Sequence, residues 1–286
     1  MALLNWSLVK ASPTFAAIRE RWIAMLADET LKEEAYQKFL SQHAGFFFSH
    51  ALAGTDQLVS AKVRLGSDFT TDFVVAKSER SLGVNYTLIE IESPHTSPYT
   101  AAGAPSARLN TAVQQILNWK RWMERNREEA KRLFPSKQFI RHDDPNFSYM
   151  IVIGRRGREN EALRNQYARE VGITIRSFDY FTDALSSRAF NAFLWISRDI
   201  VPTVSAEDNN AYANPFWMAY SDPEWRRIAS QGEYNESHMV AVNLDLLMRY
   251  RSYNADAQRD FEAFLATLPA DEKEIPEHQF EWLEFT

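Results

Sequence analysis

The stretch that decides the fold of this chain is Asp72-Phe-Val-Val, followed after a loop by Tyr86-Thr-Leu-Ile-Glu90-Ile-Glu92-Ser-Pro. Both apolar runs have the composition of buried strands, yet both carry acidic residues. Successive side chains of a strand point to opposite faces, so Glu90 and Glu92 share one face while Ile91 takes the other. We expect a neighbouring strand that begins at Asp72 to bring a third carboxylate to the same place.

Three carboxylates this close repel one another unless a cation joins them. Oxygen ligands suit Mg²⁺, and also Mn²⁺. The pattern therefore predicts a metal site of Asp72, Glu90 and Glu92 and metal-assisted hydrolysis, with a phosphodiester as the natural substrate. Asp72 and Glu92 also have structural interpretations: Asp72 could cap a turn, and Glu92 could be exposed to solvent at the end of its strand. Glu90 is the hardest of the three to solvate, since it lies between Ile89 and Ile91.

Composition sets the broad class of the protein. The 286 residues are 45% hydrophobic, enough for one large domain or for one domain with an extension. The absence of Cys excludes disulfides, thiolate metal sites and a Cys nucleophile. No apolar run approaches the ~20 residues of a membrane span, and the first ten residues lack a signal-peptide pattern. We expect a soluble, cytoplasmic protein without a membrane partner.

Charge is distributed unevenly along the chain, although the net charge is only −6. Residues 108–170 hold 14 Lys and Arg against 8 Asp and Glu, whereas residues 201–286 hold 6 against 16. A basic middle and an acidic end predict two surfaces with different partners. The alternative is an ordinary scatter of charge over helix surfaces.

Hydrophobic periodicity predicts a mixed order of helices and strands. We expect two helices within 14–43, strands at 62–66, 72–76 and 86–92, a long helix at 107–134, a strand at 149–153, a helix at 159–170, a strand at 173–177, and helices at 178–188 and 256–268. This order is typical of an α/β fold in which helices cover a mixed sheet.

A polar stretch at 206–212 marks a linker or boundary. The predicted division is a leader at 1–20, a main domain at 21–200 and an acidic C-terminal extension of unknown role at 201–286.

The Asp72 and Glu90-x-Glu92 pattern resembles the PD-(D/E)xK nuclease signature. Further segments occur in the same order as in the Shedu-type anti-phage nuclease domain, and the similarity covers roughly residues 20–190. These segments are Glu34-Ala-Tyr-Gln-Lys-Phe-Leu-Ser-Gln-His, Ile89-Glu-Ile-Glu-Ser-Pro, Ala112-Val-Gln-Gln-Ile-Leu-Asn-Trp, Ile151-Val-Ile-Gly-Arg-Arg and Ile175-Arg-Ser-Phe-Asp-Tyr. The resemblance implies a restriction-endonuclease-like fold and Mg²⁺-dependent cleavage of invading DNA. It also implies assembly into homo-oligomers, with another defence or phage protein as a possible trigger.

The chain departs from the signature at one position, because Glu92 stands where the family has Lys. A carboxylate cannot stabilise negative charge on the attacking water or the phosphate, but it can bind a second metal or accept a proton from water. Two alternatives therefore stay open. One is a catalytically inactive nuclease-fold module that binds nucleic acid or a partner protein. The other is a hydrolase of a different phosphate ester.

Further candidates surround the three carboxylates. Glu34 resembles the acidic residue on the first helix that completes this type of site. Gln115 lies one turn before Trp119 on the long helix, and it could orient a site carboxylate or a water. His95 and Ser97 follow the Glu-x-Glu strand and could line the entrance.

Basic residues provide the predicted contacts to DNA phosphates. Arg155 and Arg156 follow a strand end, where an α/β sheet commonly places its binding edge. Arg121, Arg125 and Lys131 on the long helix offer a second path for DNA.

Overall fold

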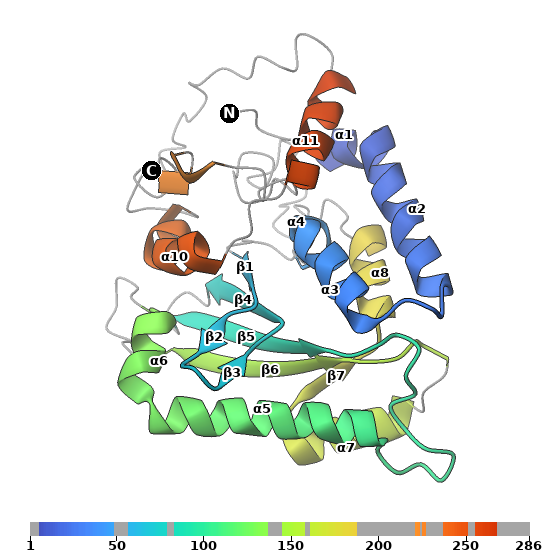
Figure 1. Cartoon of the computed structure of the whole chain (residues 1–286), viewed down its shortest axis with the longest axis vertical. Helices are drawn as coiled ribbons and strands as arrows, with labels where there is room; N and C mark the ends of the chain where they lie inside the picture. Colours follow the sequence, from blue (N-terminus) through green and yellow to red (C-terminus); the bar gives the residue numbers. More distant parts are fainter. Residues whose placement is uncertain are drawn as a thin grey trace, which may run out of the picture.

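A five-stranded mixed sheet lies at the centre of the computed structural model (Figure 1). Its order is β1 (Gln57–Ala61), β4 (Phe73–Ser78), β5 (Val84–Ile91), β6 (Asn146–Val152) and β7 (Thr174–Arg176). The pairs β1–β4 and β4–β5 are antiparallel, whereas β5–β6 and β6–β7 are parallel. The structure describes residues 6–48, 57–78, 83–136, 145–157, 161–187, 221–223, 225–226, 237–250 and 255–267.

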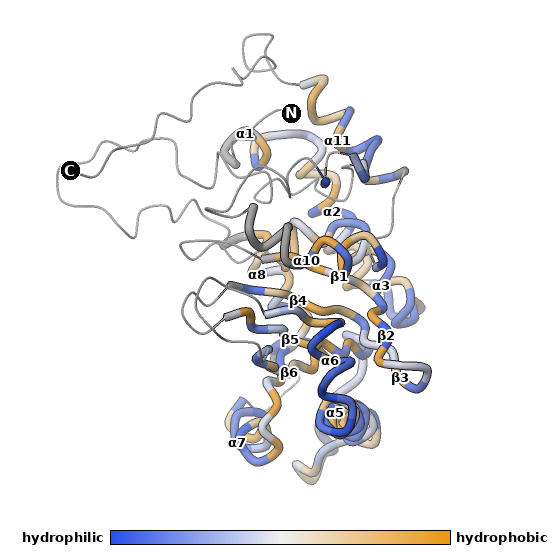
Figure 2. The backbone as a smooth tube through the Cα atoms, turned by 90° about the vertical axis from the view of Figure 1, so that its left-hand side faces the viewer, coloured by the Kyte–Doolittle hydropathy of each residue, from blue (hydrophilic) through white to orange (hydrophobic). Residues whose placement is uncertain are grey.

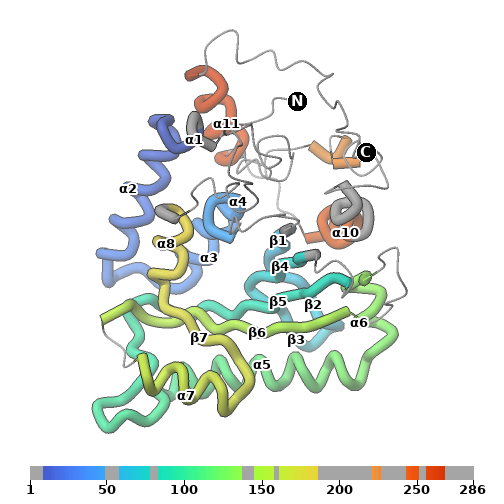
Figure 3. Tube along the Cα trace, turned by 180° about the vertical axis from the view of Figure 1, so that it is seen from behind, coloured from blue at the N-terminus to red at the C-terminus, as the bar shows by residue number. Residues whose placement is uncertain are grey.

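Helix α5 (Ala107–Arg125) makes the crossover that two parallel strands require, because β5 and β6 run in the same direction. Ser106 starts the helix, and its hydroxyl accepts a hydrogen bond from the Leu109 N–H. The apolar face of α5, with Ile116 and Trp119 fully buried, packs against β5 and β6. Helix α7 (Glu161–Val171) lies on the same side of the sheet (Figures 1 and 3).

The other face of the sheet is covered mainly by N-terminal helices and α8 (Asp179–Ser187). These N-terminal helices are α1 (Trp6–Ala11), α2 (Pro13–Ala27), α3 (Glu33–Gln42) and α4 (Ala44–Phe47). Trp22 of α2 is fully buried and stacks on Phe39 and Phe178. Its indole N–H donates to the Thr182 hydroxyl over 3.0 Å, which joins α2 to α8.

Two helices from the acidic C-terminal part pack onto this body. Helix α10 (Ser237–Tyr250) contacts β1, and α11 (Ala255–Thr267) contacts α2. Leu247 and Phe264 are fully buried within the same hydrophobic cluster as the sheet. The predicted linker at 206–212 lies outside the described residues, and the division into domains stays a prediction.

The predicted fold class, a restriction-endonuclease-like mixed sheet flanked by helices, is confirmed. Three details of the predicted elements were wrong or missing. The strand expected at 62–66 is instead a turn at Lys62 followed by β2 (Arg64–Leu65), which pairs with β3 (Phe69–Thr70) outside the main sheet. The helix expected at 107–134 breaks at Asn126, where α6 (Arg127–Leu133) begins. Strands β1 and β3 and helices α1 and α10 were not predicted.

Hydropathy along the backbone follows this layering. Strand β4 is largely hydrophobic and α6 is largely hydrophilic (Figure 2). None of the described helices is both long enough and apolar enough to cross a membrane.

Candidate active site

The three predicted carboxylates lie where β4 begins and β5 ends. Phe73 pairs with Ile89, so the next positions along these antiparallel strands, Asp72 and Glu90, lie across from each other. Glu92 follows the last residue of β5, and its N–H donates to the Val152 carbonyl of β6 over 2.9 Å. All three side chains are buried, with 5%, 7% and 6% of their surface exposed in chain order. Ligands of open α/β sheets bind at this carboxyl edge of parallel strands.

Both carboxylate oxygens of Asp72 have hydrogen-bond donors. Oδ2 accepts the Ile91 N–H over 2.9 Å, and Oδ1 lies 2.5 Å from the Lys62 ammonium. The Lys62 N–H also donates to the Asp72 carbonyl over 3.0 Å. Lys62 therefore supplies the positive charge that balances the buried Asp72, a role that the sequence did not reveal.

Glu90 has a different partner. Its Oε2 accepts a hydrogen bond of 3.0 Å from the Gln115 amide of α5. Burial raises the pKa of Glu90 far above its usual range, and the nearby carboxylates of Asp72, Glu33 and Glu92 raise it further. Without a cation beside it, burial therefore favours the protonated form of Glu90.

Helix α3 brings Glu33, rather than the predicted Glu34, into this cluster. Burial, followed by the charges of Glu92 and Asp72, raises the pKa of Glu33 to about 7. Glu34 is exposed. Helical periodicity could have found Glu33, because it lies three residues before the buried Tyr36 on the inward face of the helix.

A loop packed against the end of β6 closes the edge beyond Glu92. Gly154 adopts a φ of +72°, and its N–H donates to the Ser93 carbonyl. A Cβ atom at this glycine would lie 2.8 Å from the Thr96 carbonyl oxygen, so a larger residue would displace the loop. Burial raises the pKa of Glu92, whereas the charge of Arg108 at the start of α5 opposes this shift.

The donor set suits a hard divalent cation in its chemistry, because every candidate ligand is a carboxylate oxygen. No three His, Asp or Glu side chains within the described ranges are gathered closely enough to hold a metal ion. Instead, the ammonium of Lys62 lies against Asp72, and burial favours the protonated form of Glu90. A bound cation would take the place of the ammonium and of that proton.

The predicted phosphate ligands Arg155 and Arg156 are each paired with an acid. Arg155 makes a two-pronged contact with Asp179, and Arg156 pairs with Asp183. Burial opposes the ionisation of Asp179, but hydrogen bonds from both arginines outweigh it and lower the pKa of Asp179. The two arginines line a cavity of about 290 Å³ together with His95 and Glu29. His95 lies within 3.0 Å of the Tyr36 hydroxyl, whereas Ser97 is exposed and donates to the Tyr99 carbonyl.

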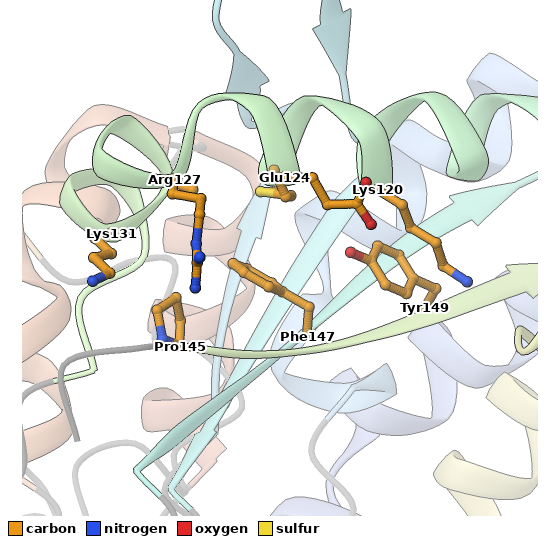
Figure 4. Close-up of a pocket in the computed structure, with 9 residues that line it drawn as sticks. Lys120, Glu124, Arg127, Lys131, Pro145, Phe147 and Tyr149 are labelled. Carbon is orange, nitrogen blue, oxygen red and sulfur yellow. The ribbon is translucent and has the colours of Figure 1, made fainter.

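The second predicted DNA path lies along α5 and α6. Arg121 and Arg125 are exposed, and Arg121 donates to Asn118. Lys131 lines a cavity of about 560 Å³ in which Lys120 and Arg127 lie over Phe147 and Tyr149 of β6 (Figure 4). The ammonium of Lys120 lies 4.8 Å from the centre of the Tyr149 ring, a cation–π contact.

A comparison with known families gives a match to the model described as Shedu protein SduA, C-terminal, over residues 30–182. The matched range contains all the carboxylates of the site, Gln115 and the basic residues named above. No curated protein matches the chain.

Proposed function

The chain belongs to the Shedu family of antiphage defence proteins, and from this premise we propose that it is a Mg²⁺-dependent deoxyribonuclease. The observation that carries the proposal is the buried pair of Asp72 and Glu90, set across from each other on β4 and β5. Burial of two acids at a sheet edge lowers the stability of the fold unless a bound cation compensates their charge, and such acids are therefore candidates for a functional site. Mn²⁺ is the expected substitute metal.

Asp72 and Glu90 would hold the cation, with Glu92 or Glu33 completing the set. When bound, a cation at these residues would supply positive charge to the phosphate and would lower the pKa of water. Gln115 orients Glu90 through its amide N–H and leaves the other carboxylate oxygen of Glu90 free to turn to the ligand.

Hydrolysis forms one bond and breaks one. The oxygen of a water molecule forms a bond to phosphorus while the bond from phosphorus to the leaving oxygen breaks. The ionised Glu92 accepts the proton of that water, and its raised pKa makes it a stronger base than an ordinary carboxylate. The leaving oxygen takes a proton from solvent.

Substrate and partners follow the same proposal. DNA phosphates would bind cations along α5 and α6 or beside Arg155 and Arg156, and this attraction weakens with salt. Assembly into a homo-oligomer and a trigger from another defence or phage protein belong to the proposal as well, and they rest on family membership.

Cleavage of plasmid DNA by the purified protein in Mg²⁺ tests the function. Asp72→Asn and Glu90→Gln should each lower the rate by about 10²-fold or more, as loss of transition-state stabilisation does. Asp68→Asn is the matched control, because Asp68 is an exposed acid in the nearby β2–β3 turn. Retention of the wild-type melting temperature would show that the fold is intact. Full activity in either site variant would refute the proposal.

One observation favours the alternative of a silent binding module, namely the carboxylate of Glu92 in place of the family's Lys. A silent module would bind DNA in the presence of Mg²⁺ and would cleave none. The cleavage assay therefore separates the two functions directly.

A further inference from the structure

Lys62 reaches the candidate site from a different strand than the signature would predict. It follows the last residue of β1, which pairs with β4 beside Asp72. Its ammonium is 2.5 Å from Asp72 Oδ1, although 53% of the Lys62 side chain is exposed against 7% for Asp72. The Lys62 side chain is therefore exposed to solvent along part of its length, while its ammonium contacts the buried acid. A substrate that approaches from solvent can reach this lysine.

The backbone of Lys62 holds it in that position. Its φ is +55°, in the left-handed region that a residue with a Cβ atom adopts infrequently. Among the described residues it is the one non-glycine residue with a positive φ. Hydrogen bonds hold the turn on both sides, from the Lys62 N–H to the Asp72 carbonyl and from the Thr71 N–H to the Val63 carbonyl. An unfavourable conformation kept at a site residue points to a functional constraint.

We propose that Lys62 is the catalytic lysine of this site and supplies from the β1 turn the charge that related sites take from the position of Glu92. The inference rests on the proposed nuclease function. With a cation held by Asp72, the ammonium of Lys62 would leave Oδ1 and would be free to contact the scissile phosphate and the attacking water. Glu92 is then left to accept the proton from that water, so the two roles fall to two residues.

Lys62 differs from Arg108, the other cation near the site, in the acids with which it interacts. Arg108 interacts electrostatically with Glu92, whereas Lys62 forms an ion pair with Asp72 and interacts electrostatically with Glu33 and Glu90. Lys62 is therefore the cation closest to the pair of acids proposed to hold the metal. A flexible ammonium can also move over the few ångströms between Asp72 and a phosphate.

The test compares Lys62→Asn, Lys62→Arg and the control Lys77→Asn in the full-length protein. Asn tolerates a positive φ, so Lys62→Asn keeps the turn and removes only the charge. Lys77 is an exposed lysine on β4. DNA cleavage in Mg²⁺ should fall by about 10²-fold or more in Lys62→Asn and by less in Lys62→Arg, and it should not change in Lys77→Asn.

Calorimetric titration with Mn²⁺ in the absence of DNA gives a second measurement. Lys62→Asn should bind Mn²⁺ as tightly as the wild type or more tightly, because the competing ammonium is gone, whereas Asp72→Asn should bind it more weakly.

Each contrary result has a distinct meaning. If the wild type cleaves DNA and Lys62→Asn cleaves it at the same rate or faster, Lys62 only balances the charge of Asp72 when no metal is bound. The inference about Lys62 then fails, while the proposed nuclease function stands. Weaker Mn²⁺ binding in Lys62→Asn would show a structural role and overturn the inference. If the wild type cleaves nothing, the proposed function fails first and this inference fails with it.

Discussion

The Gln115 amide donates a 3.0 Å hydrogen bond to Oε2 of Glu90, and this contact ties helix α5 to the acidic end of β5. The sequence predicted that Gln115 would face a site carboxylate, because it lies one turn before the buried Trp119. The neighbouring Gln114 is exposed and pairs with Asn118 instead. The two adjacent glutamines therefore form a matched pair for experiment.

We expect Gln115→Ala to slow DNA cleavage by about tenfold and to raise the Mg²⁺ concentration needed for half-maximal rate, because loss of a partner that orients a ligand carboxylate lowers metal affinity by ~10–100-fold. Gln114→Ala should match the wild type in both respects. Rates measured over a Mg²⁺ series give both quantities. Equal effects of the two substitutions would mean that the contact to Glu90 does not position the acid.

Glu33 and Glu34 make a second matched pair on α3. Glu33 has a pKa of about 7 in the folded protein, above its usual value of 4.5, so the folded state binds more protons than the unfolded state between these pH values. The stability of the metal-free protein should therefore fall as pH rises from about 4.5 to 7. Glu33→Gln should remove this part of the loss and raise the metal-free melting temperature at pH 8, by an amount that shrinks as the pH is lowered.

Glu34→Gln is the control, because Glu34 is exposed. Thermal melts in a chelator from pH 4.5 to 8 measure the effect. A melting temperature at pH 8 that is the same in Glu33→Gln and the wild type would remove Glu33 from the acidic cluster.

The site was partly predictable because strand alternation and helical spacing are local rules. They place Glu90 beside the apolar residues of β5 and turn Gln115 inward. The same helical rule favours Glu33 over Glu34, but the resemblance to a family motif outweighed it. Lys62 could not be found in this way, since its role depends on the pairing of β1 with β4 and on a left-handed turn. Strand β1 was itself missed, and no local pattern states which strands will become neighbours.

Arg155 and Arg156 are neighbours in sequence, but we expect substitution of Arg155 to affect the stability of the fold and substitution of Arg156 to affect it little. Arg155 is partly buried, binds Asp179 through two nitrogens and also donates to the Leu26 carbonyl, so Arg155→Ala should destabilise the fold by about 1–3 kcal/mol. Arg156 is exposed, and Arg156→Ala should change stability by less than about 0.5 kcal/mol. Chemical denaturation measures both values.

DNA binding as a function of salt tests whether these arginines contact phosphate. If Arg156 contacts DNA, Arg156→Ala should lower the salt slope by about one, and Asp183→Asn should strengthen binding because it releases the guanidinium. If the path instead follows α5 and α6, Lys131→Ala and Arg127→Ala will lower the slope while Arg156→Ala does not. Binding in a chelator avoids cleavage during the measurement.

His43 makes the stability of the fold sensitive to acid, and it lies outside the cluster of Asp72, Glu90, Glu92 and Glu33. Burial, with the nearby charge of Arg21, lowers the pKa of His43 to about 4, although Asp256 acts in the opposite direction and Asp260 lies 3.8 Å away. The neutral ring is therefore favoured in the folded state, and the stability that it provides is present above pH 6.5 and is lost as pH falls toward 4. The shift corresponds to roughly 3 kcal/mol over that range.

Replacement of His43 by Gln removes the titrating group, so the stability of His43→Gln should vary less between pH 6.5 and 4 than that of the wild type. Urea denaturation at a series of pH values is the measurement. The variant will have lower stability at pH 7, because the ring of His43 packs 4.5 Å from the ring of Phe39. The comparison therefore concerns the slope with pH. Parallel curves for the two proteins would contradict the assignment.

The acidic C-terminal part offers two opposed expectations, because it could repel DNA by its charge or complete the core. Contacts favour the second. The Tyr86 hydroxyl of β5 lies 2.7 Å from Asn243 Oδ1 of α10, and Leu247 on the same helix is fully buried. Leu247→Ala should therefore cost about 2–5 kcal/mol and lower the melting temperature by roughly 5–10 °C in a single transition, since α10 shares the core of the sheet.

Asp245→Asn is the matched change of charge on α10, and it should leave the melting temperature within about 1 °C, because substitutions outside the core have small effects. If the acidic part instead repels DNA by its charge, Asp245→Asn would tighten DNA binding at low salt. This gain in affinity would vanish at 1 M salt, where the Debye length is ~3 Å. Calorimetry and DNA titration on the same two variants decide between them. Two separate transitions, with only the smaller one shifted by Leu247→Ala, would show that α10 belongs to an independent unit and would restore the electrostatic interpretation.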